Sequence, residues 1–403
     1  MQNVSSSNSQ AVNVPKLRFP GFESEWETSC IGNFGSFYKG APLSKADISD
    51  NGIPFVLYGE LYTTYNEVAT EIIRKTEATV GDEYISESGD VIIPTSGETA
   101  EDIATATCIM KPGVILAGDL CIMRPNKIDG RFLSYIINHK AKYAIARIAQ
   151  GKSVVHIRPD EVEQIKVSYP SKSEQDKILC FLGLLSQKIE KQQQLIDSLK
   201  LYKRGLINNL FDRKIKTTGT WKKYALSEVL TERKTYCEKD GTYEHATLSK
   251  DGVYGKTERY DRDFLVSSDD KKYKITKEGD LCYNPANLKF GVICLNTYGD
   301  AIFSPIYVTF EIATKFDKHF IAACVTRNDF VNAALRFQQG TVYERMAVSP
   351  EDLLSMKIEL PEMSVQKHFS NIFQKLDLLI AVHEKQFESM VAQKRTLLQQ
   401  MFI

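Results

Sequence analysis

Two stretches of the chain carry the same coiled-coil seam, and they lie 191 residues apart. Apolar residues recur at alternating intervals of four and three, the spacing of a long helix packed against a partner helix. The two seams align at this offset without a gap. Even their polar interruptions coincide, because Gln192 and Lys203 of the first seam align with His383 and Lys394 of the second. The seams comprise Ile178, Leu182, Leu185, Ile189, Ile196, Leu199, Leu206 and Leu210, and Phe369, Phe373, Leu376, Ile380, Phe387, Met390, Leu397 and Met401.

A single seam would fit an amphipathic helix lying on its own domain. Duplication favours pairing, because a narrow seam over many turns needs a partner of similar length, and the other copy provides one. Ser173 is the predicted N-cap of the first helix, with Asp176 three residues later. About 40 residues at a rise of 1.5 Å give a rod of roughly 60 Å that would hold the parts at its ends apart. The residues expected to pair the helices are Ile178, Leu182, Leu185, Ile189, Ile196, Leu199, Phe369, Phe373, Leu376, Ile380, Phe387 and Met390.

The region before the first seam has the pattern of an α/β domain. Short β-like runs at 55–58, 91–93 and 120–123 are separated by Gly, Asn and Asp. A helix is predicted from Arg131 to about Gln150, followed by a loop, a short helix after Pro159 and a last strand. The apolar face of the predicted helix contains Phe132, Tyr135, Ile136, Tyr143, Ile145 and Ile148.

The second half repeats this plan. Trp221 corresponds to Trp26, a helix is predicted from about Lys318 to Gln338, and Pro350 and Pro361 match Pro159 and Pro170 at the same offset. Between these matching positions, the two halves share almost no sequence identity. Either two different binding specificities on a common scaffold or sequence drift after duplication would explain this divergence. We therefore predict an α/β fold in which two similar domains, in inverted orientation, are joined by a long antiparallel two-helix coiled coil. The predicted domains are residues 1–172, a central helix at 173–213, residues 214–361 and a C-terminal helix at 362–403.

Composition excludes several classes of protein. The 403 residues are 43% hydrophobic and 25% charged, an ordinary composition for a globular protein. No run of 18 apolar residues or signal-peptide pattern occurs, so we expect a cytoplasmic location. The eight cysteines are scattered singly and the six histidines show no ligand spacing, so no metal site is expected. Net charge is zero, with 51 basic and 51 acidic residues, which does not by itself indicate a nucleic-acid partner.

No catalytic motif stands in its required context. The pattern from Ala146 to Ser153 matches a loose phosphate loop, but a helix precedes it where a strand is needed. No G-x-G loop exists for dinucleotide or adenosylmethionine binding, so the N-P-A-N run from Asn284 more simply turns the chain. No G-x-S-x-G and no carboxylate cluster of a metal nuclease occurs. We expect no catalytic residues.

Polar and basic residues interleaved with aromatics in loops remain as candidates for DNA binding. Such side chains suit phosphate positioning and hydrogen bonding to base edges, although a solvated loop explains each of them separately. The candidates are Tyr38, Lys39, Thr95, Ser96, Gly97, Lys152, Ser153, His156, Tyr254, Lys256, Asn284, Asn287, Lys289, Gln339, Thr341, Tyr343 and Arg345.

The whole arrangement resembles the specificity (S) subunits of type I restriction-modification enzymes. The resemblance rests on the lead-in from Val14 to Phe22, the Pro170 and Pro361 helix entries, and paired motifs at the same offset. Those motifs are Gln175 and Gln366, and the pairs Lys203-Arg204 and Lys394-Arg395. The resemblance implies two target-recognition domains, each of which reads one part of a split, asymmetric site in double-stranded DNA. It also implies that the helix pair sets the gap between the two parts of that site.

The resemblance also implies a subunit without catalysis or a cofactor of its own. Its partners would be two methyltransferase (M) subunits, which bring S-adenosylmethionine and modify an extruded adenine, and two restriction (R) subunits, which use ATP and Mg. The alternative is a coiled-coil assembly or scaffold protein without DNA specificity. An adenosylmethionine-dependent enzyme is a third possibility.

Overall fold

Two helices of 40 and 39 residues, α6 (Lys172–Phe211) and α10 (Met363–Met401), are the longest elements of the chain. The computed structural model describes residues 13–151, 153–212, 215, 217, 220–238, 241–256, 272–339 and 346–403. Because α6 begins at Lys172, Ser173 lies inside its first turn and is not the N-cap. The amides of Glu174 and Gln175 donate instead to the Ser171 carbonyl oxygen.

The first domain is built on a five-stranded sheet in the order β2-β10-β6-β8-β4. A three-stranded sheet, β5-β3-β9, and the two-stranded sheets β1-β12 and β7-β11 complete it. The strands are β1 (Glu27–Cys30), β2 (Gly35–Lys39), β3 (Ile53–Leu57), β4 (Val68–Ala69), β5 (Lys75–Thr76), β6 (Asp90–Pro94), β7 (Ser96–Gly97), β8 (Thr107–Ile109), β9 (Ile115–Ala117), β10 (Leu120–Pro125), β11 (Val155–His156) and β12 (Lys166–Tyr169). The helices are η1 (Ile31–Phe34), η2 (Lys45–Asp47), α1 (Glu60–Thr63), η3 (Asp82–Tyr84), α2 (Ala100–Ile103), α3 (Gly130–Ile136), η4 (Ile137–Ala141), α4 (Lys142–Ile148) and α5 (Pro159–Glu163).

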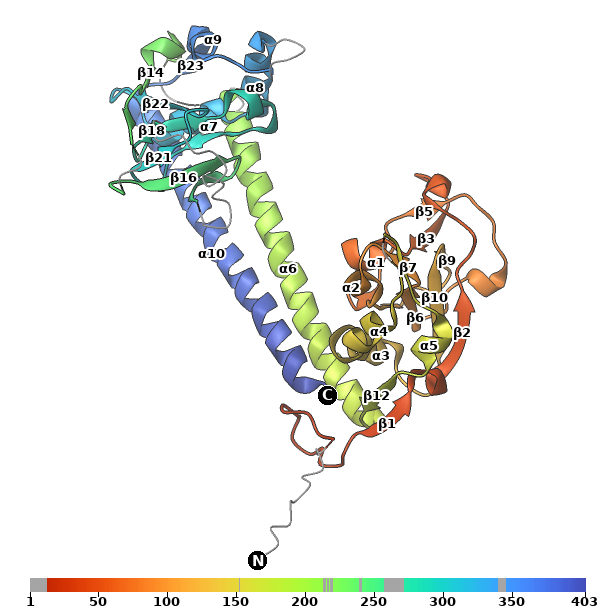
Figure 1. The fold of residues 1–403 in the computed structure, drawn as a ribbon. Coiled ribbons are helices and arrows are strands. Elements are labelled where there is room, and N and C mark those ends of the chain that lie inside the picture. Colours follow the sequence, from red (N-terminus) through yellow and green to blue (C-terminus); the bar gives the residue numbers. More distant parts are fainter. Residues whose placement is uncertain are drawn as a thin grey trace, which may run out of the picture. The chain divides into compact units, whose positions relative to one another are not determined.

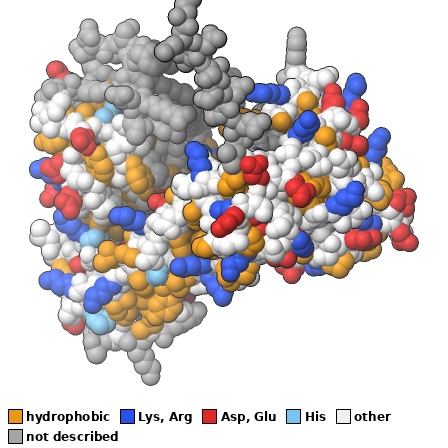
Figure 2. All heavy atoms as spheres, turned by 90° about the horizontal axis from the view of Figure 1, so that it is seen from below, with side chains coloured by type: hydrophobic (Ala, Val, Ile, Leu, Met, Phe, Trp, Pro, Cys, Tyr) orange, Lys and Arg blue, Asp and Glu red, His pale blue; other side chains and the backbone are white. Residues whose placement is uncertain are grey.

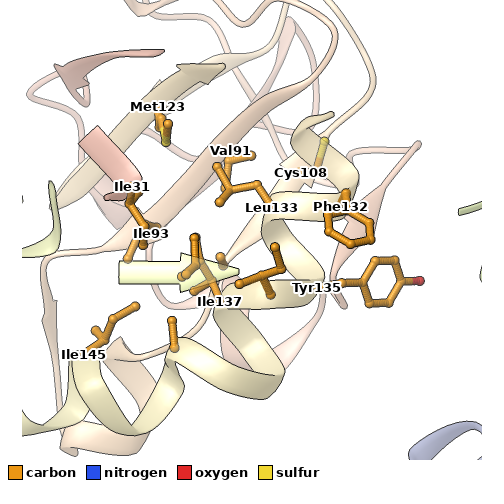
Figure 3. Close-up of a cluster of buried hydrophobic side chains, with 14 of the residues drawn as sticks. Ile31, Val91, Ile93, Cys108, Met123, Phe132, Leu133, Tyr135, Ile137 and Ile145 are labelled. Carbon is orange, nitrogen blue, oxygen red and sulfur yellow. The ribbon is translucent and has the colours of Figure 1, made fainter. Parts of the chain in front are cut away.

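Helices α3 and α4 cover one face of this sheet. Figure 3 shows Leu133 of α3 and Ile137 of the following segment η4 beside Val91 and Ile93 of the central strand β6. The helix predicted from 131 to 150 is interrupted by one π-helical segment, η4. Each π-type turn holds about one residue more than an α-turn, so the positions beyond it rotate by about 100°. Tyr143 is therefore 76% exposed, and its predicted place on the apolar face is wrong.

The second domain repeats the larger sheet and changes the smaller one. Its sheet β14-β22-β19-β20 has the connectivity of β2-β10-β6-β8, and β13-β23 matches β1-β12. The accompanying sheet has five strands, β15-β18-β21-β16-β17, in place of three. The strands are β13 (Lys222–Ala225), β14 (Leu230–Glu232), β15 (Tyr236–Cys237), β16 (Glu244–Ser249), β17 (Gly252–Gly255), β18 (Tyr273–Thr276), β19 (Leu281–Tyr283), β20 (Ile293–Leu295), β21 (Ala301–Phe303), β22 (Val308–Ile312) and β23 (Lys357–Leu360). The helices are η5 (Leu226–Glu228), η8 (Pro285–Phe290), α7 (Lys318–Val325), α8 (Asn328–Ala334), η9 (Leu335–Phe337) and α9 (Pro350–Ser355).

The chain divides into two compact units, and each contains a part of both long helices. One unit is Met1–Lys191 with Phe387–Ile403, and the other is Gln192–Gln386. In the first unit the start of α6 and the end of α10 share one apolar core, and in the second unit the end of α6 packs with the start of α10. The two helices are therefore antiparallel within each unit (Figure 1). All sixteen seam residues are buried or half-buried.

Equivalent contacts attach the long helices to both domains. Phe402 packs against Trp26 and Phe132, with ring centroids 6.3 and 5.3 Å away. Phe211, 191 positions earlier, packs in the same way against Trp221 and Phe320 at 5.8 and 5.3 Å. The α/β class predicted from the sequence is confirmed, with the long helices joined to both domains.

A buried glutamine fixes the entry of each long helix. Gln175 Nε2 donates to the Pro170 carbonyl oxygen at 2.9 Å, and its Oε1 accepts from the amide of Asp129, the N-cap residue of α3, at 3.2 Å. Gln366 makes the same two bonds in the second domain, to Pro361 at 2.8 Å and from Asp317, the N-cap residue of α7, at 3.0 Å. Both glutamines are 2% exposed. The glutamine amide therefore links three segments in each half.

Candidate nucleic-acid interface

Several predicted residues of the first domain meet at one edge of its main sheet. Strands β2 and β6 both run antiparallel to β10, so their final residues lie at the same edge. Lys39 is the last residue of β2, and Thr95 directly follows β6. Lys39 is exposed, whereas Thr95 is half-buried and its amide donates to the carbonyl oxygen of Asp119.

A segment from much later in the sequence joins this edge. Ser96 pairs with His156 across strands β7 and β11, and Ser96 Oγ lies 2.8 Å from His156 Nδ1. The amide of Ile157 donates to the Thr95 carbonyl oxygen at 3.1 Å. A reciprocal backbone bridge between Gln150 and His156 closes the loop that follows α4. The structure thus brings together Thr95, Ser96, Gly97 and His156, with Ser153 two residues before β11, whereas Lys152 lies outside the described residues.

A groove of about 900 Å³ opens at the same edge. Arg74 is positioned in it by Glu60, a 4% exposed carboxylate that accepts from Arg74 Nε at 2.6 Å and from the Leu57 amide at 3.0 Å. Burial raises the pKa of the Tyr62 phenol, which keeps it a hydrogen-bond donor. Sequence reasoning did not select Lys45, Tyr62 or Arg74, because only folding brings their segments together. The lining comprises Leu43, Ser44, Lys45, Ala46, Leu57, Tyr58, Gly59, Glu60, Tyr62, Thr63, Arg74, Gly97, Glu98, Gly118, Asp119 and Val154.

Tyr38 is exposed on β2 and is flanked by an ion pair. The guanidinium of Arg124 lies 5.5 Å from the Tyr38 ring centre and forms two bonds of 2.9 Å to Asp90. The bond to Asp90 raises the pKa of the Arg124 guanidinium, which is charged in any case. The second domain holds the matching aspartate, Asp280, with Arg233 at 2.7 and 2.9 Å. The two aspartates lie at the starts of β6 and β19, at the strand ends opposite to the edges that carry Thr95 and Asn284.

The second domain presents an edge of the same construction. Strands β14 and β19 both run antiparallel to β22, and Asn284 directly follows β19. The amide of Val348 donates to the Pro285 carbonyl oxygen at 3.2 Å, as Ile157 does to Thr95. Gln339 and Ala347 form the reciprocal bridge that Gln150 and His156 form in the first domain. The candidates Thr341, Tyr343 and Arg345 lie outside the described residues.

The candidates on η8 differ in their availability. Asn284 is 7% exposed, and its side chain caps η8 by accepting from the Ala286 amide at 3.1 Å. Asn287 is half-buried and Lys289 is exposed. Phe290, which sequence reasoning did not select, is 65% exposed beside Lys289. The structure therefore assigns Asn284 a structural role and leaves the rest of the turn accessible.

Tyr254 and Lys256 belong to a different part of the second domain. Tyr254 is half exposed on β17 and lines a groove of about 1040 Å³. The backbone amide of Lys256 donates to the His245 carbonyl oxygen. The groove has basic and acidic side chains in equal number, and blue and red side chains are also interspersed on the face in Figure 2. Its lining comprises Lys200, Lys203, Arg204, Ile207, Asn208, Asp212, Lys250, Asp251, Tyr254, Ala323, Thr326, Arg327, Asn328, Asp329, Asp377, Ile380 and Glu384.

The chemistry available at both edges is hydrogen bonding and charge. Within the described ranges, no three His, Cys, Asp or Glu side chains are placed to hold a metal ion. No helix in the same ranges is long and apolar enough to cross a membrane. Hydroxyl, imidazole, amide and ammonium groups at a strand edge suit contacts to phosphates and base edges.

Comparison with known proteins identifies relatives of this arrangement. Residues 23–201 match the family model described as "Type I restriction modification DNA specificity domain". The MjaVIII specificity subunit of a type I restriction enzyme from Methanocaldococcus jannaschii is 22% identical over 410 residues, which cover 95% of this chain and 92% of that protein.

Two solved structures share the fold. The type I restriction-modification S subunit from M. genitalium superposes with a TM-score of 0.62 at 14% identity, covering 97% of this chain and 99% of that one. A chain from a structural study of the assembly and conformational transition of the type I system superposes at 0.53 with 13% identity, covering 94% and 97%. The chain is thus similar to type I restriction-modification specificity subunits in sequence and in fold, and the match to the type I DNA specificity domain model covers its residues 23–201.

Proposed function

We propose that this chain is the DNA sequence-recognition subunit of a type I restriction-modification enzyme and reads a bipartite, asymmetric site with its two domains. One observation carries the proposal: the same strand edge occurs in both domains with different side chains. The backbone ties Ile157 to Thr95 and Val348 to Pro285 are equivalent, yet the first edge offers a serine and a histidine where the second offers asparagine, lysine and phenylalanine. A common frame with different polar groups suits two different half-sites.

Long helices that contact both domains support a second role as a spacer. Their equivalent attachments, Phe402 in one unit and Phe211 in the other, support a fixed relation between helix length and the gap in the DNA site. Exposed apolar residues on α6, namely Leu184 at 62%, Leu201 at 59% and Tyr202 at 62%, support the docking of methyltransferase subunits and, through them, of restriction subunits. The catalytic steps, S-adenosylmethionine, ATP and Mg would belong to those partners.

Segment exchange tests whether the two domains read DNA independently. Residues 26–169 are replaced by the matching segment of a relative, and modified sites are mapped across the genome of cells that contain the partner subunits. We expect one half of the modified sequence to change and the other half to persist. A hybrid whose two half-sites change together would contradict independent reading.

Helix insertion tests the spacer. Four residues inserted after Gln193 lengthen α6 by about 6 Å, roughly two base-pair steps of 3.4 Å. The insertion leaves the seam nearly in frame as a stutter. We expect unchanged half-sites separated by about one or two more base pairs, since the rise per residue sets the added length. If a stable variant modifies only sites with the original gap, helix length does not set the gap and the helices serve only as an assembly surface.

A coiled-coil scaffold without DNA specificity is the second candidate function, because the chain carries equal numbers of basic and acidic residues. The net charge is zero and both signs line the large groove of the second domain. A DNA-binding chain should lose affinity linearly in log salt, because phosphate contacts release counterions. Affinity for duplex DNA that does not depend on salt, or is absent, would favour the scaffold.

A further inference from the structure

Phe290 is the most exposed phenylalanine in the part of the chain that the structure describes. It is 65% exposed at the end of η8, while Leu288, two residues earlier, is fully buried in the core of the second domain. Exposed apolar side chains are common singly, so exposure alone assigns nothing to Phe290. Its position is more informative, because η8 begins at Pro285, separated by one residue from the end of β19, at the edge described above.

The turn that carries Phe290 is held at both ends. Asn284 accepts from the Ala286 amide at its start, and the Asn284 amide donates to the Val292 carbonyl oxygen at 3.0 Å. At its end Gly291 adopts a left-handed conformation with φ of 76°, and its amide donates to the Leu288 carbonyl oxygen at 2.8 Å. Because this backbone is already held, binding through Phe290 costs less conformational entropy than binding through a mobile loop would.

Two neighbours of Phe290 carry groups that DNA can bind, a positive charge for a phosphate and an amide for a base edge. Lys289 Nζ lies 5.0 Å from the Phe290 ring centre, so a positive charge accompanies the apolar surface. The half-buried side-chain amide of Asn287 forms no hydrogen bond with another described residue. An amide can bond adenine N6 and N7 in the major groove, and the C5-methyl of thymine is the apolar group that a base pair offers there.

We propose that the turn from Asn284 to Gly291 reads an A·T base pair in the major groove. Phe290 packs on the thymine methyl group, Asn287 bonds the paired adenine, and Lys289 contacts a phosphate. This inference rests on the proposed function and names the base pair that the second domain reads.

The test removes one side of the contact at a time, either the C5-methyl group of thymine or the ring of Phe290. The full-length chain first selects its sequence from a random duplex library. Thymines in the selected site are then replaced one at a time by deoxyuridine, which lacks only the C5-methyl. The duplexes are titrated with wild type, Phe290→Ala and, as a matched control, Leu378→Ala, whose leucine is 67% exposed on α10.

One thymine should account for the effect of Phe290. We expect Phe290→Ala to bind the selected duplex about tenfold more weakly, within the range for a lost base contact. Deoxyuridine at one position should weaken wild type several-fold and leave Phe290→Ala unaffected, while Leu378→Ala behaves as wild type throughout.

Other outcomes would overturn the inference. Phe290 does not read thymine if Phe290→Ala binds as tightly as wild type. The same conclusion follows if its affinity is lower than that of wild type by the same factor on every duplex, with thymine or with deoxyuridine. A Phe290→Ala variant with normal DNA binding that fails to assemble with methyltransferase subunits assigns Phe290 to a protein contact. Failure of the wild-type chain to select any sequence would overturn the proposed function as well.

Discussion

At the scale of single residues, the strongest constraints are buried polar groups that join segments far apart in sequence. Gln175 and Gln366 each satisfy a backbone carbonyl and a backbone amide in equivalent positions of the two halves. Glu67 accepts from His139 Nε2 at 2.8 Å and from Lys394 Nζ at 3.3 Å, and so attaches α10 to the first domain. Removing such a group leaves its buried partners without hydrogen bonds.

Replacing Gln175 by alanine should destabilise the first unit. The Pro170 carbonyl and the Asp129 amide lose their partner, and each unsatisfied buried group costs about 1–3 kcal/mol. Thermal unfolding of the full chain should show an earlier transition for Gln175→Ala and for the equivalent Gln366→Ala. Gln187→Ala, at an exposed position on the same helix, serves as the control. Equal transition temperatures in all three variants would mean that water replaces the side-chain amide without loss.

The Glu67 carboxylate should make stability depend on pH. Burial raises its pKa, but the hydrogen bond from His139 and the charges of Lys394 and His139 outweigh burial and lower the pKa from 4.5 to about 2. The stabilisation is therefore complete above about pH 5 and declines as the pH falls toward 2, reaching about 3 kcal/mol at most.

Denaturant unfolding of wild type and Glu67→Gln from pH 7 to pH 2 measures this contribution. The difference between their unfolding free energies should shrink as the pH falls. Glu71→Gln removes a carboxylate that is 84% exposed and should show little pH-dependent difference. A difference between wild type and Glu67→Gln that stays constant across this range would contradict the lowered pKa.

At the scale of elements, periodicity predicted the helices well and the turns poorly. The seam placed all sixteen apolar residues at buried or half-buried positions, because their burial follows from helix geometry alone. Gln192 and His383, the equivalent interruptions, meet each other, with Gln192 Nε2 2.9 Å from both Nδ1 and the carbonyl oxygen of His383. Polar layers of this kind fix register in coiled coils.

Sequence reasoning was less successful where tertiary contacts set the outcome. A π-helical segment changed the phase that placed Tyr143 inside, and a capping role buried Asn284. The groove with Lys45 and Arg74 depends on several loops meeting at the edge of a sheet, which no local pattern encodes. The aromatic Phe290 beside Lys289 on an N-P-A-N turn was a readable signal that the search for polar groups missed.

Neighbouring leucines on α6 allow a controlled test of the seam. Leu185 is half-buried and Leu184 is 62% exposed. Leu185→Lys places a charge in the apolar interface and should cost several kcal/mol, whereas Leu184→Lys should stay within about 0.5 kcal/mol of wild type. Denaturant unfolding compares the two variants directly. Similar losses in both variants would show that the packing at Leu185 is not specific.

At the scale of the whole molecule, the two compact units differ in how the chain builds them, and only the first combines separate parts of the sequence. The first unit needs residues 387–403, whose Leu398, Met401 and Phe402 are at most 3% exposed in the core of the first domain. The second unit is one continuous stretch from Gln192 to Gln386. The pseudo-equivalent phenylalanines therefore stabilise different units.

Alanine at each phenylalanine should separate the stabilities of the two units. Phe402→Ala should destabilise the first unit by about 3–5 kcal/mol, because it opens a cavity beside Trp26 and Phe132. Phe211→Ala should act on the second unit, against Trp221 and Phe320. Hydrogen exchange measured by mass spectrometry resolves which unit loses protection. Loss of protection in the same residues for both variants would contradict the division into two units.

The first unit combines residues 1–191 with residues 387–403, so the order of synthesis affects when it can fold. Domains generally fold in the order of translation. Here the second unit is complete in sequence once Gln386 has left the ribosome, whereas the core around Trp26 and Phe132 waits for Phe402. A chain released early would carry a folded second unit and an open first one, with apolar surface that marks it for chaperones and proteases. Synthesis of residues 387–403 must therefore precede closure of the first domain.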